Sequence, residues 1–368
     1  MQANKFIISG GGTGGHIYPA IAIAHAIKEK QPNAEILFVG ANGKMEMEKV
    51  PKAGYEIIGL DIAGLQRKLT VKNLSFPFKL FKSLKKAKQI VKDFNPDVAI
   101  GVGGYASGPL LRQAGKQGVP TLLQEQNSYP GITNKLLARK AKKICVAYDN
   151  MERFFDERKI VFTGNPVRKE ILNIEGKKER GLTHFGLEQG KKTLLVIGGS
   201  LGARTVNNSI KNAVELLNEN GVQVLWQTGK SYCEDMKSFV KEKGFENIKV
   251  YDFIYEMDLA YASADLVVSR AGALSISELC LVGKPIILIP SPNVSEDHQT
   301  KNAMALVNHN AAVLVKDADA PETLGKEIME LMNNENKLIK LSVNIIGFGR
   351  PNAAEAIANE VIKLINIE

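Results

Sequence analysis

Ser9-Gly10-Gly11-Gly12-Thr13-Gly14-Gly15-His16 is the stretch from which the fold of this chain can be predicted. It follows the short apolar run Phe6–Ile8 and precedes Ile17–Ala24, which has the composition of the beginning of a helix. Its five glycines let the backbone approach a bulky ligand closely and adopt positive φ where that is needed. Because a strand that leads through such a loop into a helix directs N–H groups at an anion, the stretch predicts a phosphate site.

The length and composition predict a globular protein of two domains. A chain of 368 residues exceeds the usual size of one domain, and its charged fraction of 24% is ordinary for a soluble protein. It contains no apolar run long enough to span a bilayer and no signal-peptide pattern, so we expect a cytoplasmic protein. The cysteines Cys145, Cys233 and Cys280 lack the spacing of metal ligands, which predicts free, buried thiols.

Short apolar runs alternate with helical stretches, which predicts a parallel sheet with helices on both faces. In the first half these runs are Phe6–Ile8, Ile36–Val39, Val98–Val102, Thr121–Leu123 and Ile144–Ala147. The polar stretch after Gly164–Arg168 then indicates a domain boundary. The pattern restarts with the strand Thr193–Ile197, the glycine-rich loop Gly198–Arg204 and a helix through Leu217. Further strands are expected at Val222–Trp226, Leu266–Ser269 and Pro285–Ile289.

The predicted fold class is therefore α/β, with two Rossmann-like, doubly wound domains. We expect the first domain at residues 1–165, the second at 166–350 and a closing C-terminal helix at 351–368. Ligands in open parallel sheets bind at the carboxyl ends of the strands. If the two halves face each other, they form a cleft with one glycine-rich loop on each wall.

The first loop does not fit the two best-known nucleotide motifs. Gly10, Gly12 and Gly15 match G-x-G-x-x-G, but the second strand ends in Val39–Asn42 without the acidic residue that would bind a ribose of NAD. Neither glycine-rich loop is followed by the Lys-Ser/Thr pair of a nucleoside-triphosphate P-loop. His16 closes the first loop, where it either caps the helix or acts as an acid or base beside the anion site.

Two later stretches carry candidate ligand contacts. Arg270–Glu278 follows a buried strand, and Glu278 either complements the helix dipole or accepts hydrogen bonds from the two hydroxyls of a ribose. Pro290–Thr300 is a polar loop after another buried strand, and Gln299 lies where ligand contacts are expected in such sheets. Because adjacent side chains rarely face one another, an acid–base role for His298 with Asp297 is disfavoured.

The positive charge of the chain is concentrated in one segment. The formal net charge is +9, and residues 66–92 contain nine basic side chains and no acidic one. The nine are Arg67, Lys68, Lys72, Lys79, Lys82, Lys85, Lys86, Lys88 and Lys92. The rest of the chain is neutral on balance, so the segment is a local basic patch.

The basic segment has the pattern of an amphipathic helix. Pro77 is suited to a helix start, and Leu80, Leu84, Ala87 and Val91 then recur at helical spacing. An ordinary solvated helix, attachment to an anionic membrane surface and nucleic-acid binding are the alternatives. Separate aromatic platforms for single strands are not evident, and the phosphate-type loops elsewhere in the chain favour the membrane, so we expect no nucleic acid. The expected membrane contacts are Leu74, Phe76, Phe78, Lys79, Phe81, Lys82, Lys85 and Lys86.

Five motifs together make the sequence similar to a known family. They are Gly11-Gly12-Thr13-Gly14-Gly15-His16, Gln124-Glu125-Gln126-Asn127, Gly164-Asn165-Pro166-Val167-Arg168, Gly198-Gly199-Ser200-Leu201-Gly202-Ala203 and Arg270-Ala271-Gly272-Ala273-Leu274-Ser275-Ile276-Ser277-Glu278. In this order and spacing they resemble the undecaprenyldiphospho-muramoylpentapeptide β-N-acetylglucosaminyltransferase family of bacterial cell-wall enzymes. The resemblance runs from the first strand to the final helix.

The resemblance implies a GT-B glycosyltransferase that inverts the configuration of the sugar it transfers. The implied reaction moves GlcNAc from UDP-GlcNAc to the 4-hydroxyl of the muramoyl sugar of lipid I, which gives lipid II and UDP. It implies a C-terminal domain that binds the donor and an N-terminal domain that binds the acceptor. The basic helix maps onto the part of the family that contacts the membrane, so we expect a peripheral protein on the cytoplasmic side of the cell membrane.

The resemblance also implies the donor contacts. Ser200 and its loop would contact the diphosphate with Arg168 nearby, and the Ile254 backbone would meet the uracil. Glu278 would bind the ribose hydroxyls, and Gln299 would address GlcNAc. The contacts that line the nucleotide and sugar would be Ala273, Leu274, Ser275, Ile276 and Ser277. The loop Asn293–His298 before Gln299 departs from the more basic version of many relatives.

On the acceptor side, Thr13, Gly14 and Gly15 would face the acceptor diphosphate and the transferred sugar, and Asn127 would address GlcNAc. Our own hypothesis is that His16 is the base for the acceptor hydroxyl, because it lies beside the presumed acceptor site. Helix N-termini and Arg168 can stabilise the leaving diphosphate without a metal. No Asp-x-Asp pair lies in a loop suited to bind Mg²⁺ together with the diphosphate, because Asp317-x-Asp319 is on a late polar segment. We therefore expect no metal and no cofactor.

Two alternatives come from other functional classes. Another UDP-sugar enzyme of the GT-B fold, such as a UDP-GlcNAc 2-epimerase or a glycolipid glycosyltransferase, would share the glycine-rich loops and the ribose-binding glutamate. A basic nucleic-acid-binding protein would depend only on residues 66–92, and it would bind oligonucleotides in a salt-sensitive way.

Overall fold

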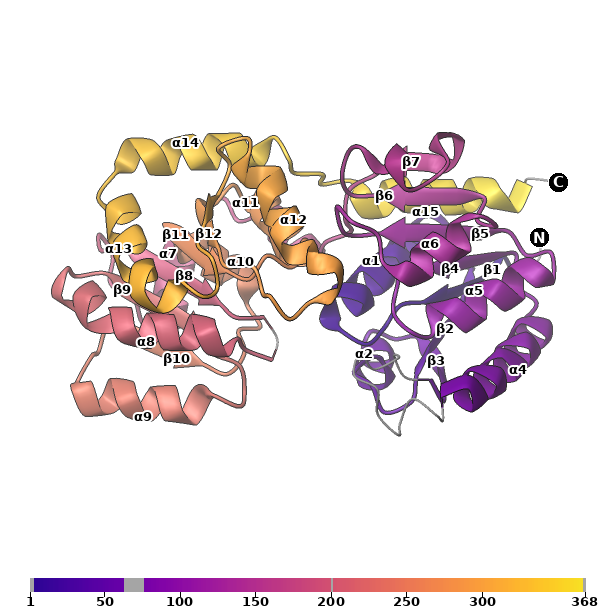
Figure 1. Cartoon of the computed structure of the whole chain (residues 1–368), viewed down its shortest axis with the longest axis horizontal. Helices are drawn as coiled ribbons and strands as arrows, with labels where there is room; N and C mark the ends of the chain where they lie inside the picture. The colour runs from indigo at the N-terminus through magenta and orange to yellow at the C-terminus, as the bar shows by residue number, and fades with distance from the viewer. Residues whose placement is uncertain (1–2, 63–75, 200, 367–368) are drawn as a thin grey trace. The chain divides into compact units, whose positions relative to one another are not determined.

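The computed structural model describes residues 3–62, 76–199 and 201–366, and the chain divides into two compact units (Figure 1). Unit 1 comprises Met1–Arg168 and Asn352–Glu368, and unit 2 comprises Lys169–Pro351. Residues 166–168 thus lie with unit 1, whereas we expected them in the second domain. The C-terminal helix also belongs to unit 1.

Unit 1 contains a parallel sheet with the strand order β3-β2-β1-β4-β5-β6-β7. Its strands are β1 (Lys5–Ser9), β2 (Glu35–Ala41), β3 (Glu56–Leu60), β4 (Val98–Gly101), β5 (Thr121–Glu125), β6 (Lys143–Val146) and β7 (Ile160–Phe162). Its helices are α1 (Gly14–Lys30), α2 (Glu46–Lys52), α4 (Phe76–Phe94), α5 (Ser107–Lys116), α6 (Ile132–Ala138) and α15 (Ala353–Lys363). Short 3-10 helices span Met151–Arg153, Glu157–Lys159 and Leu364–Asn366.

Helices cover both faces of this sheet, as Figure 1 shows. Phe6 and Ile8 of β1 pack with α1 and α15 on one face. Ile7, which points to the opposite face, packs with α4, α5 and α6. This alternation along one fully buried strand is what a doubly wound sheet requires. The closing helix α15 packs on α1, with Ile357 and Val361 buried.

Unit 2 repeats the architecture with the parallel order β10-β9-β8-β11-β12-β13. Its strands are β8 (Thr193–Ile197), β9 (Gln223–Gln227), β10 (Ile248–Tyr251), β11 (Leu266–Ser269), β12 (Ile286–Leu288) and β13 (Val313–Leu314). Its helices are α7 (Lys178–Phe185), α8 (Arg204–Glu219), α9 (Cys233–Lys243), α10 (Met257–Ser263), α11 (Ala273–Val282), α12 (His298–Val307), α13 (Ala320–Met332) and α14 (Glu335–Ile346). Two 3-10 helices span Lys169–Leu172 and Ser295–Asp297.

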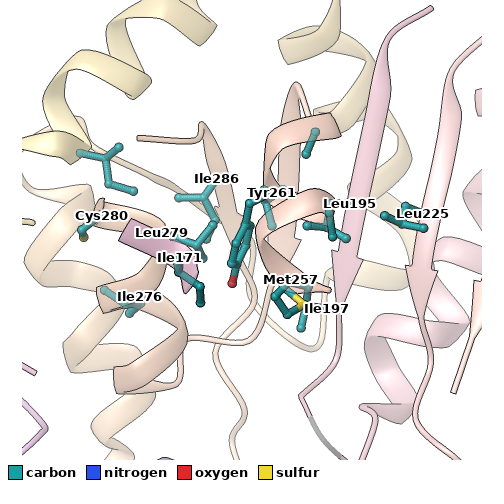
Figure 2. Close-up of a cluster of buried hydrophobic side chains, with 14 of the residues drawn as sticks. Ile171, Leu195, Ile197, Leu225, Met257, Tyr261, Ile276, Leu279, Cys280 and Ile286 are labelled. Atoms are coloured by element: carbon teal, nitrogen blue, oxygen red, sulfur yellow. The ribbon is translucent and has the colours of Figure 1, made fainter. Parts of the chain in front are cut away.

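The two faces of this second sheet have separate cores. Leu195 and Ile197 of β8 pack with Met257 and Tyr261 of α10 on one face, as Figure 2 shows. Leu194 and the other alternate residues of β8 pack with α8, α9 and α13 on the opposite face. The predicted pair of Rossmann-like, doubly wound α/β folds is therefore confirmed.

Four strands were not predicted, and they are the edge strands of the two sheets: β3, β7, β10 and β13. Each is only partly buried: β3 and β10 include a charged residue, β13 has only two residues, and β7 is a run of just three apolar residues that are not fully buried. Other predictions are confirmed. The helix expected to begin near Pro77 is α4, and the three cysteines are free and buried. None of the described helices combines the length and apolar content needed to cross a membrane.

Candidate functional site

The glycine-rich loop of unit 1 joins β1 to the N-terminus of α1 at the carboxyl edge of the sheet. Thr13 is the N-cap residue of α1 and has extended backbone angles. Two amides of the loop are used internally, because Gly11 N donates to Gly103 O at 3.4 Å and Gly12 N donates to Glu46 Oε2 at 2.9 Å. No described residue accepts a hydrogen bond from the amides of Thr13, Gly14 or Gly15. These three N–H groups are therefore available to an anion.

His16 lies in the first turn of α1, directly beside these amides. Its Nδ1 is 3.4 Å from Thr13 Oγ1, and its ring packs on Gly103, where a Cβ atom would lie 2.6 Å from the ring Cδ2. The loops after β1 and β4 thus fix the half-buried ring at the carboxyl edge of the sheet. This position suits a group that exchanges a proton with a ligand at the loop.

A buried carboxylate stands at the same edge, at the end of β5. Glu125 accepts hydrogen bonds from Asn127 N at 3.0 Å, Asn127 Nδ2 at 3.2 Å, Gly131 N at 3.2 Å and Asn134 Nδ2 at 2.8 Å. Burial raises the pKa of the Glu125 carboxyl, and these hydrogen bonds partly oppose that rise. Of this motif we predicted only Asn127 as a ligand contact, and the structure shows that Glu125 orients its side chain.

Arg168 is the last residue of the first segment of unit 1. Its guanidinium lies 5.7 Å from the ring centroid of Tyr18, a cation–π distance, and Tyr18 lies on α1 two positions after His16. The structure therefore groups Arg168 with the first glycine-rich loop of the same unit.

The second glycine-rich loop joins β8 to α8 and is closed by a turn in which Gly202 N donates to Gly199 O at 3.0 Å. Gly202 has a φ of +79° and lies against Thr228, whose carbonyl oxygen would be only 2.0 Å from a Cβ atom at this position. Only glycine fits there. Ser200, the predicted diphosphate contact, lies outside the described residues.

Gln227, at the end of β9, connects this loop to the next one. Its Nε2 donates to Gly199 O at 3.3 Å, and its Oε1 accepts from Ile254 N at 2.9 Å. The Ile254 amide is thus already used, and its carbonyl oxygen is the backbone group that can accept from a ligand. Gln227 was not predicted, because nothing in its own segment distinguishes it from another buried strand residue.

Glu278 is a buried residue of α11 that lies beyond the first turn of the helix. The Tyr261 hydroxyl donates to its Oε2 at 3.1 Å, and Tyr261 itself is 1% exposed. A carboxylate that only complements the helix dipole belongs in the first turn, so this alternative is disfavoured. The residues Ala273–Ser277 that precede it form the start of α11 after the N-cap Gly272, which has no side chain to occupy the terminal amides.

Two further polar groups order the remaining loops of unit 2. Gln299, in the first turn of α12, accepts from Ser291 N at 2.8 Å through Oε1, which leaves its amide nitrogen to donate. Arg270 forms an ion pair with Asp317, and Asp317 accepts from Thr205 Oγ1 at 3.0 Å. This ion pair joins the ends of β11 and β13 to the start of α8, and it also explains what Asp317 does in the late polar segment.

The basic helix α4 exposes apolar side chains among lysines. Phe78 is 74% exposed and Phe81 is 69% exposed, and Lys79 and Lys85 are exposed nearby. Lys82 is paired with Asp61 at 3.3 Å. The exposed Lys86 donates to Gly59 O at 2.7 Å. Leu74 and the side chain of Phe76 lie outside the described part of the chain.

The described residues contain no group of three or more His, Cys, Asp or Glu side chains that could hold a metal ion. Each unit thus carries its own group of candidate residues: His16 lies beside the glycine-rich loop of unit 1, and Glu278 belongs to unit 2, which holds the second glycine-rich loop.

Comparisons with known proteins agree with this description. Residues 6–146 match the model of the glycosyltransferase family 28 N-terminal domain, and residues 193–357 match that of its C-terminal domain. The UDP-N-acetylglucosamine--N-acetylmuramyl-(pentapeptide) pyrophosphoryl-undecaprenol N-acetylglucosamine transferase of Cytophaga hutchinsonii is 60% identical over 99% of this chain and 98% of its own. The protein of that name from Bacteroides fragilis is 57% identical over 99% of this chain and 96% of its own. The crystal structure of Acinetobacter baumannii MurG has 28% identity and a TM-score of 0.78, covering 98% of this chain and 100% of that one.

Proposed function

Because this chain belongs to the family of UDP-N-acetylglucosamine--N-acetylmuramyl-(pentapeptide) pyrophosphoryl-undecaprenol N-acetylglucosamine transferases, we infer that it transfers GlcNAc from UDP-GlcNAc to lipid I. The product is lipid II, a precursor of peptidoglycan. The observation that carries this inference is full-length similarity, at 60% identity, to an enzyme of that name. These relatives do not support the epimerase or nucleic-acid alternatives.

A two-substrate assay tests the reaction. The purified protein is incubated with UDP-GlcNAc and a lipid I analogue, and UDP release is measured together with the disaccharide product. We expect UDP release that requires both substrates. Release without the acceptor, or no release with it, would contradict the transferase reaction.

We propose that unit 2 binds the donor. The buried Glu278 carboxylate supports this, because a carboxylate can accept hydrogen bonds from both hydroxyls of a ribose and the Tyr261 hydroxyl already holds this one in place. Uracil would meet the Ile254 backbone, and the diphosphate would lie at the loop of Ser200, where the α8 N-terminus and Arg168 stabilise the charge of the leaving UDP. Gln299, Asn127 and the residues Ala273–Ser277 are the remaining donor contacts that we propose.

We propose that unit 1 binds the acceptor diphosphate at the amides of Thr13, Gly14 and Gly15. The His16 ring is next to these amides, so it would take the proton of the acceptor 4-hydroxyl as the oxygen bonds to the anomeric carbon. The bond between that carbon and the UDP oxygen breaks on the opposite side, which inverts the configuration. No metal ion is needed for this displacement if helix N-termini and Arg168 stabilise the leaving group.

We also propose that α4 attaches the protein peripherally to the cytoplasmic side of the cell membrane, where a lipid-linked acceptor is held. Phe78 and Phe81 are large apolar side chains with little protein contact, and the exposed lysines around them suit an anionic surface. Two exposed phenylalanines on a basic helix are the combination that interfacial binding requires.

The double substitution Phe78→Ser and Phe81→Ser should weaken binding to anionic phospholipid vesicles about tenfold or more, because the apolar anchor is lost. Vesicle co-sedimentation measures the bound fraction. The matched control is Ile339→Ser with Val343→Ser on α14, two side chains that are 54% and 65% exposed. Unchanged vesicle binding of the α4 variant, or equal weakening by both variants, would contradict the proposed membrane contact.

A further inference from the structure

A buried carboxylate lies directly beneath the glycine-rich loop of unit 1. Glu46 is the first residue of α2 and is 0% exposed. Its Oε2 accepts from Gly12 N at 2.9 Å, and its Oε1 accepts from Ala41 N at 3.0 Å. One side chain thus connects the loop after β1 with the end of β2.

Two glycines leave the space that this carboxylate fills. A Cβ atom at Gly11 would lie 2.2 Å from Glu46 Oε1, and one at Gly40 would lie 2.6 Å from its Cγ. The three atoms nearest to that Cβ at Gly11 all belong to Glu46. Part of the glycine content of the loop therefore serves this internal carboxylate rather than a ligand.

The carboxylate divides the loop amides into two sets. The Gly11 and Gly12 amides point inward, to Gly103 O and Glu46, whereas those of Thr13, Gly14 and Gly15 have no acceptor among the described residues. Because the Gly12 amide already donates to Glu46, a diphosphate at this loop would be left with the second set of amides.

We propose that Glu46 is a positioning residue for the acceptor site: it fixes the glycine-rich loop in the conformation that presents Thr13, Gly14 and Gly15 to a diphosphate and keeps His16 beside it. This inference rests on the proposed function of the loop. Glu46 does not touch the substrates, and its effect is confined to the acceptor side of the reaction.

Glu46→Gln tests this role with little change of shape. The glutamine oxygen can accept a hydrogen bond from one of the two backbone amides. Its NH2 group then faces the other amide, which is also a donor, so one of the two hydrogen bonds to the side chain is lost. We expect an acceptor KM at least about tenfold higher, with the affinity of unit 2 for UDP unchanged. The matched control is Glu355→Gln, which removes an exposed ion pair with Lys30 of α1 at 2.8 Å in the same unit. An acceptor KM that stays at the wild-type value, or a loss shared by UDP affinity, overturns the proposal.

A double-mutant cycle tests the contact itself. Gly11→Ala should lower kcat/KM for the acceptor strongly, because its Cβ collides with the Glu46 carboxylate. In a Glu46→Ala background that space is empty, so Gly11→Ala should then cost no more than about threefold. Additive losses in the cycle would overturn the role of Glu46.

The wild-type assay and amide hydrogen exchange together distinguish failure of the proposed function from failure of this inference. If the wild-type protein shows no acceptor-dependent UDP release, the transferase reaction fails. Amide hydrogen exchange at Thr13–Gly15 then still tests Glu46, because Glu46→Gln should speed exchange there while exchange in unit 2 stays unchanged.

Discussion

Replacing His16 by alanine is expected to lower turnover by about 10² to 10⁴-fold, the range usual for loss of a general base, while UDP binding remains at the wild-type level. The physical reason is the location of the ring. It lies next to the amides at the start of α1 and is fixed by Thr13 and Gly103, so its substitution removes a proton acceptor from unit 1, whereas we propose that UDP binds to unit 2. Single-turnover kinetics with saturating lipid I analogue and calorimetry with UDP measure the two quantities.

His25 provides the control, because it lies on the same helix and near Tyr55 instead of the loop. His25→Ala should leave turnover within about twofold of wild type, as expected for a surface substitution. Turnover of the His16→Ala variant near that of wild type would exclude the histidine as the base. Glu125, a buried carboxyl group with a raised pKa at the end of β5, would then be the next residue to test.

The interior strands of both sheets could be predicted from sequence, because a strand that is buried on both faces has a continuous run of apolar residues. β1 reads Phe6-Ile7-Ile8, in which every side chain is buried, and the glycine-rich loop that follows gives the direction of the chain. The edge strand β7 has the same number of apolar residues, but none of them is fully buried, and β13 is only two residues long. Edge strands are held mainly by the neighbour they pair with, which local sequence does not reveal.

Among the candidate site residues, too, those within a local sequence pattern could be predicted and those that act through distant contacts could not. His16 and Glu278 could be found because each stands within a glycine-containing stretch whose spacing is informative by itself. Glu46 and Tyr261 could not, because each acts through a contact with a residue far away in the chain: Glu46 with Gly12, 34 positions earlier, and Tyr261 with Glu278, 17 positions later and on another helix. Such supporting groups depend on how helices pack on the sheet, and they carry no local pattern.

Arg168 illustrates the limit of boundaries drawn from composition. The polar run after it suggested that the second domain begins at residue 166, whereas the chain enters unit 2 only at Lys169. The Arg168 guanidinium lies 5.7 Å from the ring centroid of Tyr18 on α1, in the same unit. A change of three residues in a boundary therefore moves a candidate phosphate contact from one unit to the other.

Glu278→Ala is expected to weaken UDP binding by about 10²-fold or more, since two hydrogen bonds from ribose hydroxyls to a buried carboxylate are lost together. Titration of the variant with UDP measures this effect. The sharper measurement compares UDP with 2′-deoxy-UDP. The wild-type protein should prefer UDP, whereas the variant should bind both nucleotides with similar affinity, because it lacks the carboxylate that accepts a hydrogen bond from the 2′-hydroxyl.

Tyr261→Phe tests the contribution of the tyrosine hydroxyl separately from that of the Glu278 carboxylate. The substitution removes only the hydroxyl that donates to Glu278 Oε2 at 3.1 Å and keeps the packing of the ring against the core of unit 2 (Figure 2). We expect a loss of about three- to tenfold in UDP affinity with the preference for UDP over 2′-deoxy-UDP retained, since the hydroxyl only positions the carboxylate and the two ribose contacts remain. A Glu278→Ala variant that still prefers UDP would show that the ribose is bound elsewhere. A Tyr261→Phe variant as weak as Glu278→Ala would instead mean that the tyrosine hydroxyl itself is a ligand contact.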